Sequence, residues 1–151
     1  MNEEVAIAQA LDRWTEKVGR QFGPLSRGKR RMLLAVAAGS GGVRVSALAA
    51  RLDVTPAGAT RMIDTLEKLG YVQRFQRPDT DQRQVHVALT PSGATALEAA
   101  NRAFAESVRT TLAGLSAEDL GRLAALLQRL SSGSGEGRGL EALTRTPDHA
   151  S

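Results

Sequence analysis

The chain has 151 residues, of which 42% are hydrophobic and 24% charged, and this length and composition are typical of one globular domain rather than a disordered segment. It contains no cysteine, which excludes disulfides, thiol catalysis and cysteine-ligated metal sites. The formal net charge is +4 and the isoelectric point is about 10.3, so the chain has either a surface for a polyanion such as nucleic acid or a merely solvated basic surface.

The sequence shows no signal for export or membrane insertion. Its first residues are acidic where a signal peptide needs positive charge, and its longest apolar run has seven residues. We therefore expect a cytoplasmic protein with no membrane partner.

Two helices are predicted at the start of the chain. The first covers residues 3–22, because its apolar residues recur at helical spacing at Ile7, Leu11, Trp14, Val18 and Phe22. The second begins after Ser26, a suitable N-cap, and ends at Ala38 before a glycine-rich turn.

A helix-turn-helix pattern follows. Residues 43–45 are predicted to be extended, and Ser46 is a candidate N-cap for a short helix that ends at Leu52. Thr55 and Pro56 then start a helix that ends at residue 69, since threonine supplies a capping oxygen and proline is favoured at the first helical position.

Beyond residue 70 the period of the pattern changes from helix to strand. Residues 71–76 and 84–89 are predicted to form a hairpin with an exposed polar tip over residues 77–83.

Two further helices complete the prediction. A long helix follows Thr90 and Pro91, with an inner face of Leu97, Asn101, Phe104, Val108, Leu112 and Leu115. Ser116 caps a last helix, on which four leucines form an apolar seam at Leu120, Leu123, Leu127 and Leu130. The fold class is therefore mainly α with a small β wing, in one domain of residues 1–131, and residues 132–151 are expected to form a flexible tail.

The helix that starts at Pro56 has two different faces. Ala59, Met62, Ile63, Leu66 and Leu69 are assigned to the core, and Ala57, Thr60, Arg61 and Asp64 to the opposite face. Small residues beside a basic tip suit the major groove, where Arg61 can bind guanine and Thr60 can contact a base. Ser46 and Thr55 suit phosphate oxygens. The alternative is a structural surface helix on which Arg61 pairs with Asp64.

Arginines gather around the hairpin. Arg74, Arg77 and Arg83 flank or occupy the tip, and a narrow minor groove attracts inserted arginine. We expect Asp81 to order Arg83 through an ion pair, and the alternative is an ordinary charged turn.

These motifs resemble those of the MarR family of bacterial winged helix-turn-helix regulators. The stretch Asp53 to Val72 (DVTPAGATRMIDTLEKLGYV) is similar to that family's recognition helix, and Asp81-Gln82-Arg83 followed by Leu89-Thr90 and Gly93 is similar to its wing signature. The resemblance covers about residues 5–130.

The resemblance implies a DNA-binding lobe over about 43–90 and a homodimer formed by helices at about 3–22 and 91–130. It implies that Thr55, Pro56, Ala57, Thr60 and Arg61 contact the major groove or phosphates. It also implies that Arg83 reaches the minor groove while Asp81 orients it. The expected function is a sequence-specific, ligand-responsive repressor that binds double-stranded DNA at a palindromic operator.

A small-molecule effector would need a crevice, for which Trp14, Phe22 and Arg30 are candidates, although the helical stripe that carries the two rings is more often core or dimer interface. No enzyme motif occurs, so we expect no catalytic residues, cofactor or metal, and we expect His86 and His149 to lie at the surface. The alternative function is a winged-helix protein-interaction module without specific DNA binding.

Overall fold

The computed structural model describes residues 2–78 and 84–132. Asp81, Arg83, His149 and residues 133–151 of the predicted tail therefore lie outside the described residues, whereas Ser132, its first residue, is the last residue of a helix. The chain divides into two compact units, Met1–Thr111 and Leu112–Ser151, where the sequence predicted one domain that extends to residue 131.

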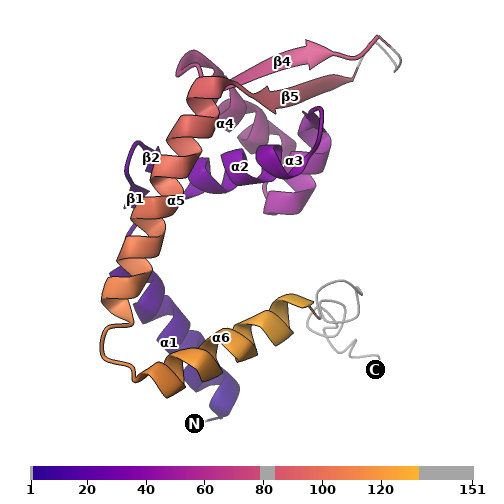
Figure 1. The fold of residues 1–151 in the computed structure, drawn as a ribbon. Helices are drawn as coiled ribbons and strands as arrows, with labels where there is room; N and C mark the ends of the chain where they lie inside the picture. The colour runs from indigo at the N-terminus through magenta and orange to yellow at the C-terminus, as the bar shows by residue number, and fades with distance from the viewer. Residues whose placement is uncertain (1, 79–83, 133–151) are drawn as a thin grey trace, which may run out of the picture. The chain divides into compact units, whose positions relative to one another are not determined.

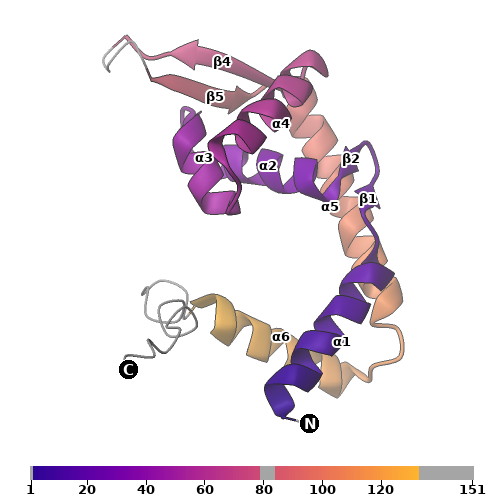
Figure 2. The same ribbon diagram turned by 180° about the vertical axis from the view of Figure 1, so that it is seen from behind.

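Helices form most of the first unit. They are α1 (Glu3–Val18), α2 (Arg27–Ala38), α3 (Val45–Leu52), α4 (Pro56–Lys68) and α5 (Pro91–Thr111). Figures 1 and 2 show α2, α3 and α4 packed together beside one end of the long α5, with α1 alongside the other end. The predicted order of these helices is confirmed.

The first helix is shorter than predicted. It ends at Val18 because Gly19 takes a φ of 93° and donates its N–H to the carbonyls of Thr15 and Glu16. Phe22 lies instead in β1 (Gln21–Phe22), which pairs with β2 (Leu25–Ser26). Phe22 continues the apolar spacing because it is a core residue, 1% exposed.

The predicted hairpin is confirmed and belongs to a three-stranded antiparallel sheet. Its strands are β3 (Val43–Arg44), β4 (Val72–Gln76) and β5 (Val85–Leu89), in the order β3-β5-β4. We call β4, β5 and the loop between them the wing. The short β3 attaches the turn after α2 to the wing.

Most predicted helix caps are confirmed. Ser26 Oγ accepts from the Lys29 N–H at 3.3 Å, and Thr90 Oγ1 accepts from the Gly93 N–H at 3.0 Å. Ser46 is the exception: α3 begins at Val45, and its N-cap is Arg44, which makes no side-chain capping bond. Ser46 cannot cap the helix because it already lies in the first turn.

The core joins the helices and the inner face of the wing. Its fully buried side chains include Leu25, Leu33, Leu48, Ile63 and Leu66. Leu69 was assigned to this core but is 49% exposed, because α4 ends one residue earlier.

His86 was expected at the surface and is instead 4% exposed. It lies opposite Phe75 in the wing, with 5.8 Å between the ring centroids. Its Nδ1 is buried without a hydrogen-bond partner in the described structure. The sequence pattern misses this because both His86 and its neighbour Val87 are buried, which breaks strict alternation along β5.

In the second unit, α6 spans Ala117–Ser132, and Ser116 Oγ accepts from the Asp119 N–H at 3.2 Å, as predicted. Leu112 and Leu115 were placed on the preceding helix, but α5 ends at Thr111. None of the described residues of α6 is buried. Among the described helices, none is long and apolar enough to cross a membrane.

Candidate nucleic-acid interface

The start of α4 presents small side chains and one arginine. Thr55 Oγ1 accepts from the Gly58 N–H at 3.0 Å, and Pro56 occupies the first turn of the helix. All of the sequence-predicted contact residues here are exposed, namely Ser46, Thr55, Pro56, Ala57, Thr60 and Arg61. Because four of the last five have short side chains, this end of α4 allows a close approach to its backbone.

A close contact within the first turn of α4 explains why residue 58 is glycine. A Cβ built at this position would lie 3.0 Å from Thr55 Oγ1, which is tighter than ordinary van der Waals contact. Glycine therefore leaves room for the capping hydroxyl that begins α4.

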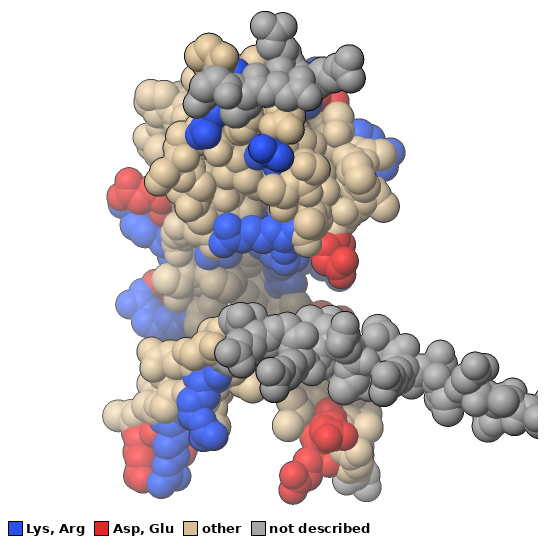
Figure 3. Space-filling view, turned by 90° about the vertical axis from the view of Figure 1, so that its right-hand side faces the viewer, with Lys and Arg blue, Asp and Glu red and all other residues tan. Residues whose placement is uncertain are grey.

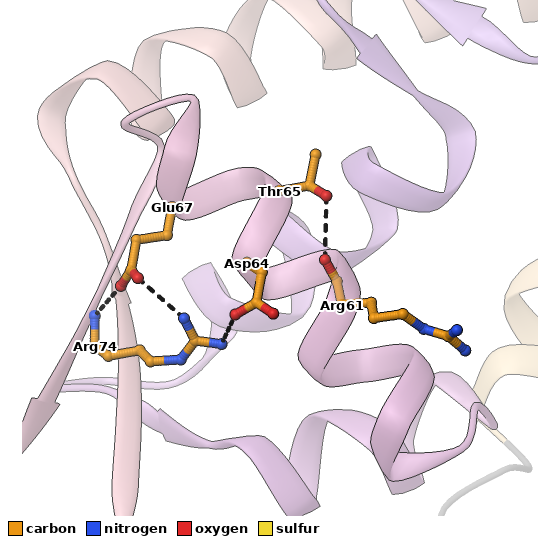
Figure 4. Close-up of polar contacts among 5 residues, drawn as sticks. All are labelled: Arg61, Asp64, Thr65, Glu67 and Arg74. Atoms are coloured by element: carbon orange, nitrogen blue, oxygen red, sulfur yellow. Dashed lines mark hydrogen bonds and ion pairs between the residues drawn. The ribbon is translucent and has the colours of Figure 1, made fainter.

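Arg61 does not pair with Asp64. Asp64 Oδ1 lies 2.5 Å from Arg74 Nη2 instead, and Figure 4 shows the side chain of Arg61 directed away from Asp64 and Arg74. Among residues 2–78 and 84–132, no ion pair of Arg61 occurs. The alternative interpretation of this face, in which Arg61 pairs with Asp64, is wrong.

Arg74 contacts α4 through its guanidinium group and through its backbone N–H (Figure 4). Besides the contact with Asp64, its Nη1 lies 3.0 Å from Glu67 Oε1, and its backbone N–H donates to Glu67 Oε2 at 3.1 Å. Its side chain is 25% exposed. Although Arg74 was predicted as a wing arginine for DNA, its guanidinium is engaged by carboxylates of the neighbouring helix.

Arg77 connects the wing to the glycine-rich turn after α2. Its Nη2 donates to the carbonyl oxygen of Gly41 at 2.5 Å. In the same turn Gly42 takes a φ of 103°, and a Cβ there would lie 2.5 Å from the ring of Phe75. The wing is therefore held near the loop end of β4 by this turn, as well as by α4.

A hollow of about 390 Å³ opens between α3, α4 and the wing, lined by Arg44, Val45, Ser46, Thr60, Arg74, Gln84 and Val85. Sequence reasoning missed Arg44 and Gln84 as members of this surface. Arg44 is one of the basic residues that give the chain its net charge of +4, which was the available signal, whereas nothing in the sequence marks Gln84.

The surface of the first unit is basic where these elements meet solvent. Figure 3 shows several separate blue lysine and arginine side chains on a mostly uncharged face, with red acidic side chains toward its edges. This distribution favours contact with a polyanion.

A second candidate site lies between α1, α2 and α5. Trp14 and Arg30, two of the three predicted ligand residues, line a cavity of about 220 Å³ together with Thr15, Val18, Arg27, Arg31 and Phe104. Phe22 does not line it. It packs edge-on against Phe104, with ring centroids 5.1 Å apart, and so supports the cavity wall from behind.

Arg30 is held in place at this cavity. Its guanidinium carbon lies 4.1 Å from the centroid of the Phe104 ring, and its Nε donates to Asn101 Oδ1 at 2.9 Å. Burial lowers the pKa of Arg30 from its ordinary value because desolvation disfavours the charged form. No group of three or more His, Asp or Glu residues suited to a metal ion occurs in the described part of the chain.

The helix pair α3–α4, followed by the wing, defines a winged helix-turn-helix protein. Residues 32–85 match the model of the MarR family, and the chain belongs to this family. The matched residues include α3, α4 and β4, so the resemblance found in the sequence is confirmed.

Individual relatives are regulators, in agreement with the prediction that the chain is not an enzyme. The chain is 40% identical over 82 residues to an HTH-type transcriptional regulator of Mycobacterium bovis, an alignment that covers 54% of this chain and 57% of the relative. The match thus spans little more than half the length of that protein.

Solved structures share the fold. A probable transcriptional regulator from Pseudomonas aeruginosa aligns with a TM-score of 0.67 and 28% identity, over 85% of this chain and 96% of that one. A mutant form of Escherichia coli MarR, complexed with operator DNA, aligns with a TM-score of 0.68 and 23% identity, over 85% and 96% of the two chains.

Proposed function

We propose that this chain is a transcriptional regulator that binds double-stranded DNA and reads its site with the first turns of α4. The observation that carries the proposal is the exposed start of α4, where Arg61 lacks an ion pair among the described residues and stands beside Thr60 and Ala57. An arginine free to form two hydrogen bonds with guanine gives base discrimination in the major groove. The operator complex of the E. coli relative supports the same use of this fold.

Other residues complete the proposed interface. Thr55, Pro56 and Ser46 would face phosphates beside the helix, and Arg77, Asp81 and Arg83 would act at the wing, where Arg83 reaches the minor groove. Asp81 and Arg83 enter this proposal from the sequence motif, since they lie outside the described residues.

The proposed assembly is a homodimer on a palindromic operator. In α1, Ile7 and Leu11 are 59% and 52% exposed, and in α6, Leu127 and Leu130 are 48% and 72% exposed. Helices with such apolar faces are stabilised when a second copy covers them. A two-fold dimer would place two copies of α4 at half-sites about 34–36 Å apart.

The proposed mode of control is repression released by a small ligand. The cavity beside Trp14, Arg30 and Phe104 combines aromatic walls with three arginines, which suits a planar aromatic anion. A ligand there would act on α2, which packs against α3 and α4, and on α5 and α1, which pack against each other.

Binding to DNA can be measured by fluorescence anisotropy across a salt series. The probes are duplexes from the intergenic region next to the chain's own gene and a random duplex of the same length. We expect nanomolar affinity for a specific site, tighter than random DNA by a factor of about 10³ or more. Equal, steeply salt-dependent affinity for both duplexes would show only a basic surface without sequence specificity. Absence of binding at low salt would favour the protein-interaction module.

A further inference from the structure

The contacts of Arg74 join the wing to the recognition helix α4. One residue of β4 makes three contacts with α4: Nη2 with Asp64 Oδ1 at 2.5 Å, Nη1 with Glu67 Oε1 at 3.0 Å, and the backbone N–H with Glu67 Oε2 at 3.1 Å. The planar fork of a guanidinium can bind two carboxylates at once with fixed geometry, whereas an ammonium acts as a point charge. Figure 4 shows Asp64 and Glu67 on the same side of α4, both facing Arg74.

The charges of this cluster are unfavourable for a phosphate contact. Two carboxylates and one guanidinium leave a net charge of −1, and the carboxyl side chains are 49% and 42% exposed. Such a cluster repels a DNA backbone, so its presence beside a DNA-reading helix needs a reason other than affinity.

The position of the cluster supplies that reason. Arg74 fixes β4 against α4 on one side, and Arg77 fixes the end of the same strand region to the Gly41 carbonyl on the other. Side chains on α4 and on the wing must reach neighbouring grooves at the same time, and a small displacement between them weakens one set of contacts.

We propose that Arg74 is a positioning residue that sets the orientation of the wing relative to α4 and thereby contributes specificity rather than affinity for DNA. It acts through Asp64 and Glu67 and makes no phosphate contact of its own. This inference rests on the proposed function, because specificity for DNA presupposes a DNA site.

The sign of one effect separates positioning from simple electrostatics. The double variant Asp64→Asn/Glu67→Gln removes two negative charges, which by charge alone tightens binding to any DNA. If the carboxylates hold Arg74, affinity for the specific site falls about tenfold while affinity for random DNA stays equal or rises. Tighter binding to both duplexes would overturn the proposal.

A matched control separates a general charge effect from a local one. Glu98 on α5 forms an exposed ion pair with Arg102 at 3.5 Å. The variant Glu98→Gln removes a carboxylate from the same unit, and we expect it to leave the ratio of specific to random affinity unchanged. A fall in that ratio equal to that of the double variant would also count against the proposal.

Variants of Arg74 itself test for a direct phosphate contact. We expect Arg74→Lys to lower the affinity for the specific site and Arg74→Ala to lower it further. In both variants the slope of log affinity against log salt should stay unchanged. A phosphate contact predicts instead a slope smaller by about 0.9 and equal losses on both duplexes. That result would assign Arg74 to the interface and overturn the positioning role.

Hydrogen exchange of the wing amides gives a test without DNA. In the double variant we expect the Arg74 amide and its neighbours in β4 and β5 to lose protection about tenfold, while the amides of α5 keep theirs. Unchanged protection would overturn the proposal even if DNA binding were normal. If the unaltered chain showed no preference for its own intergenic DNA, the proposed function would fail, and hydrogen exchange would still decide whether Arg74 holds the wing.

Discussion

Gly93, in the first turn of α5, lies directly against the backbone carbonyl of Tyr71, which precedes β4. A Cβ built on Gly93 would overlap Tyr71 O. The same carbonyl oxygen accepts from the Thr90 N–H at 3.0 Å, and Thr90 Oγ1 accepts from the Gly93 N–H at 3.0 Å. The motif of Thr90 and Gly93 therefore fixes the residue before β4, where the wing begins, to the start of α5.

The variant Gly93→Ala should lower the free energy of unfolding by about 2–3 kcal/mol, because a methyl group at this position forces the backbone apart. Urea unfolding measures the difference. A matched control is Gly121→Ala in α6, where an added Cβ meets nothing within 4 Å and alanine should stabilise the helix by about 0.5–1 kcal/mol. An equal response of the two variants would contradict the close approach at Tyr71.

The local chemistry of caps and breaks was largely predictable from the sequence. Ser26, Thr55, Thr90 and Ser116 all begin helices as expected, because a capping hydroxyl acts within three residues of its own position. Ser46 failed for a reason that is not local: β3 pairs with β5 as far as Arg44, and this pairing sets where α3 begins.

Partners that depend on tertiary structure could not be predicted. Asp64 had a possible helical partner in Arg61, but the wing brings Arg74 closer, and an exposed i,i+3 pair adds too little free energy to compete. Phe22 was predicted to be helical because its spacing continues that of the apolar residues of α1. Spacing alone could not exclude a buried strand, which also places an apolar side chain in the core. The prediction of core residues on α4 was correct at Ile63 and Leu66, where the helical spacing of apolar residues agrees with the observed burial.

The variant Arg61→Ala should reduce affinity for the specific site by about 1–3 kcal/mol and leave affinity for random DNA nearly unchanged, because a lost guanine contact removes discrimination at one base pair. Anisotropy titrations with both duplexes measure the two losses. The control Arg102→Ala removes the same charge at an exposed position on α5 and should leave the ratio of specific to random affinity unchanged. Equal losses of Arg61→Ala on both duplexes would exclude a base-reading role.

The cavity beside Trp14 has a built-in reporter, because Trp14 is the single tryptophan of the chain and its Nε1 donates to Thr111 Oγ1 at 2.9 Å. With benzoate as a probe, we expect saturable quenching of tryptophan fluorescence. Arg30→Gln should weaken this binding about tenfold or more by removing a charge-assisted contact. Arg44→Gln, at the other hollow, should leave it unchanged. Equal benzoate binding by both variants would show that Arg30 does not hold the anion.

The apolar face of α1 gives a test of the proposed dimer. Leu11 is 52% exposed in the single chain, and in a two-fold dimer a substitution acts once in each copy. Leu11→Ser should therefore weaken dimerisation by about 3–6 kcal/mol if the side chain is fully covered, which sedimentation velocity detects as a shift from dimer to monomer on dilution. The control is Val54→Ser, which changes a side chain that is 37% exposed between α3 and α4 and should leave the dimer intact. A monomeric unaltered chain, or a Leu11→Ser variant that dimerises as tightly as the unaltered chain, would exclude α1 from the interface.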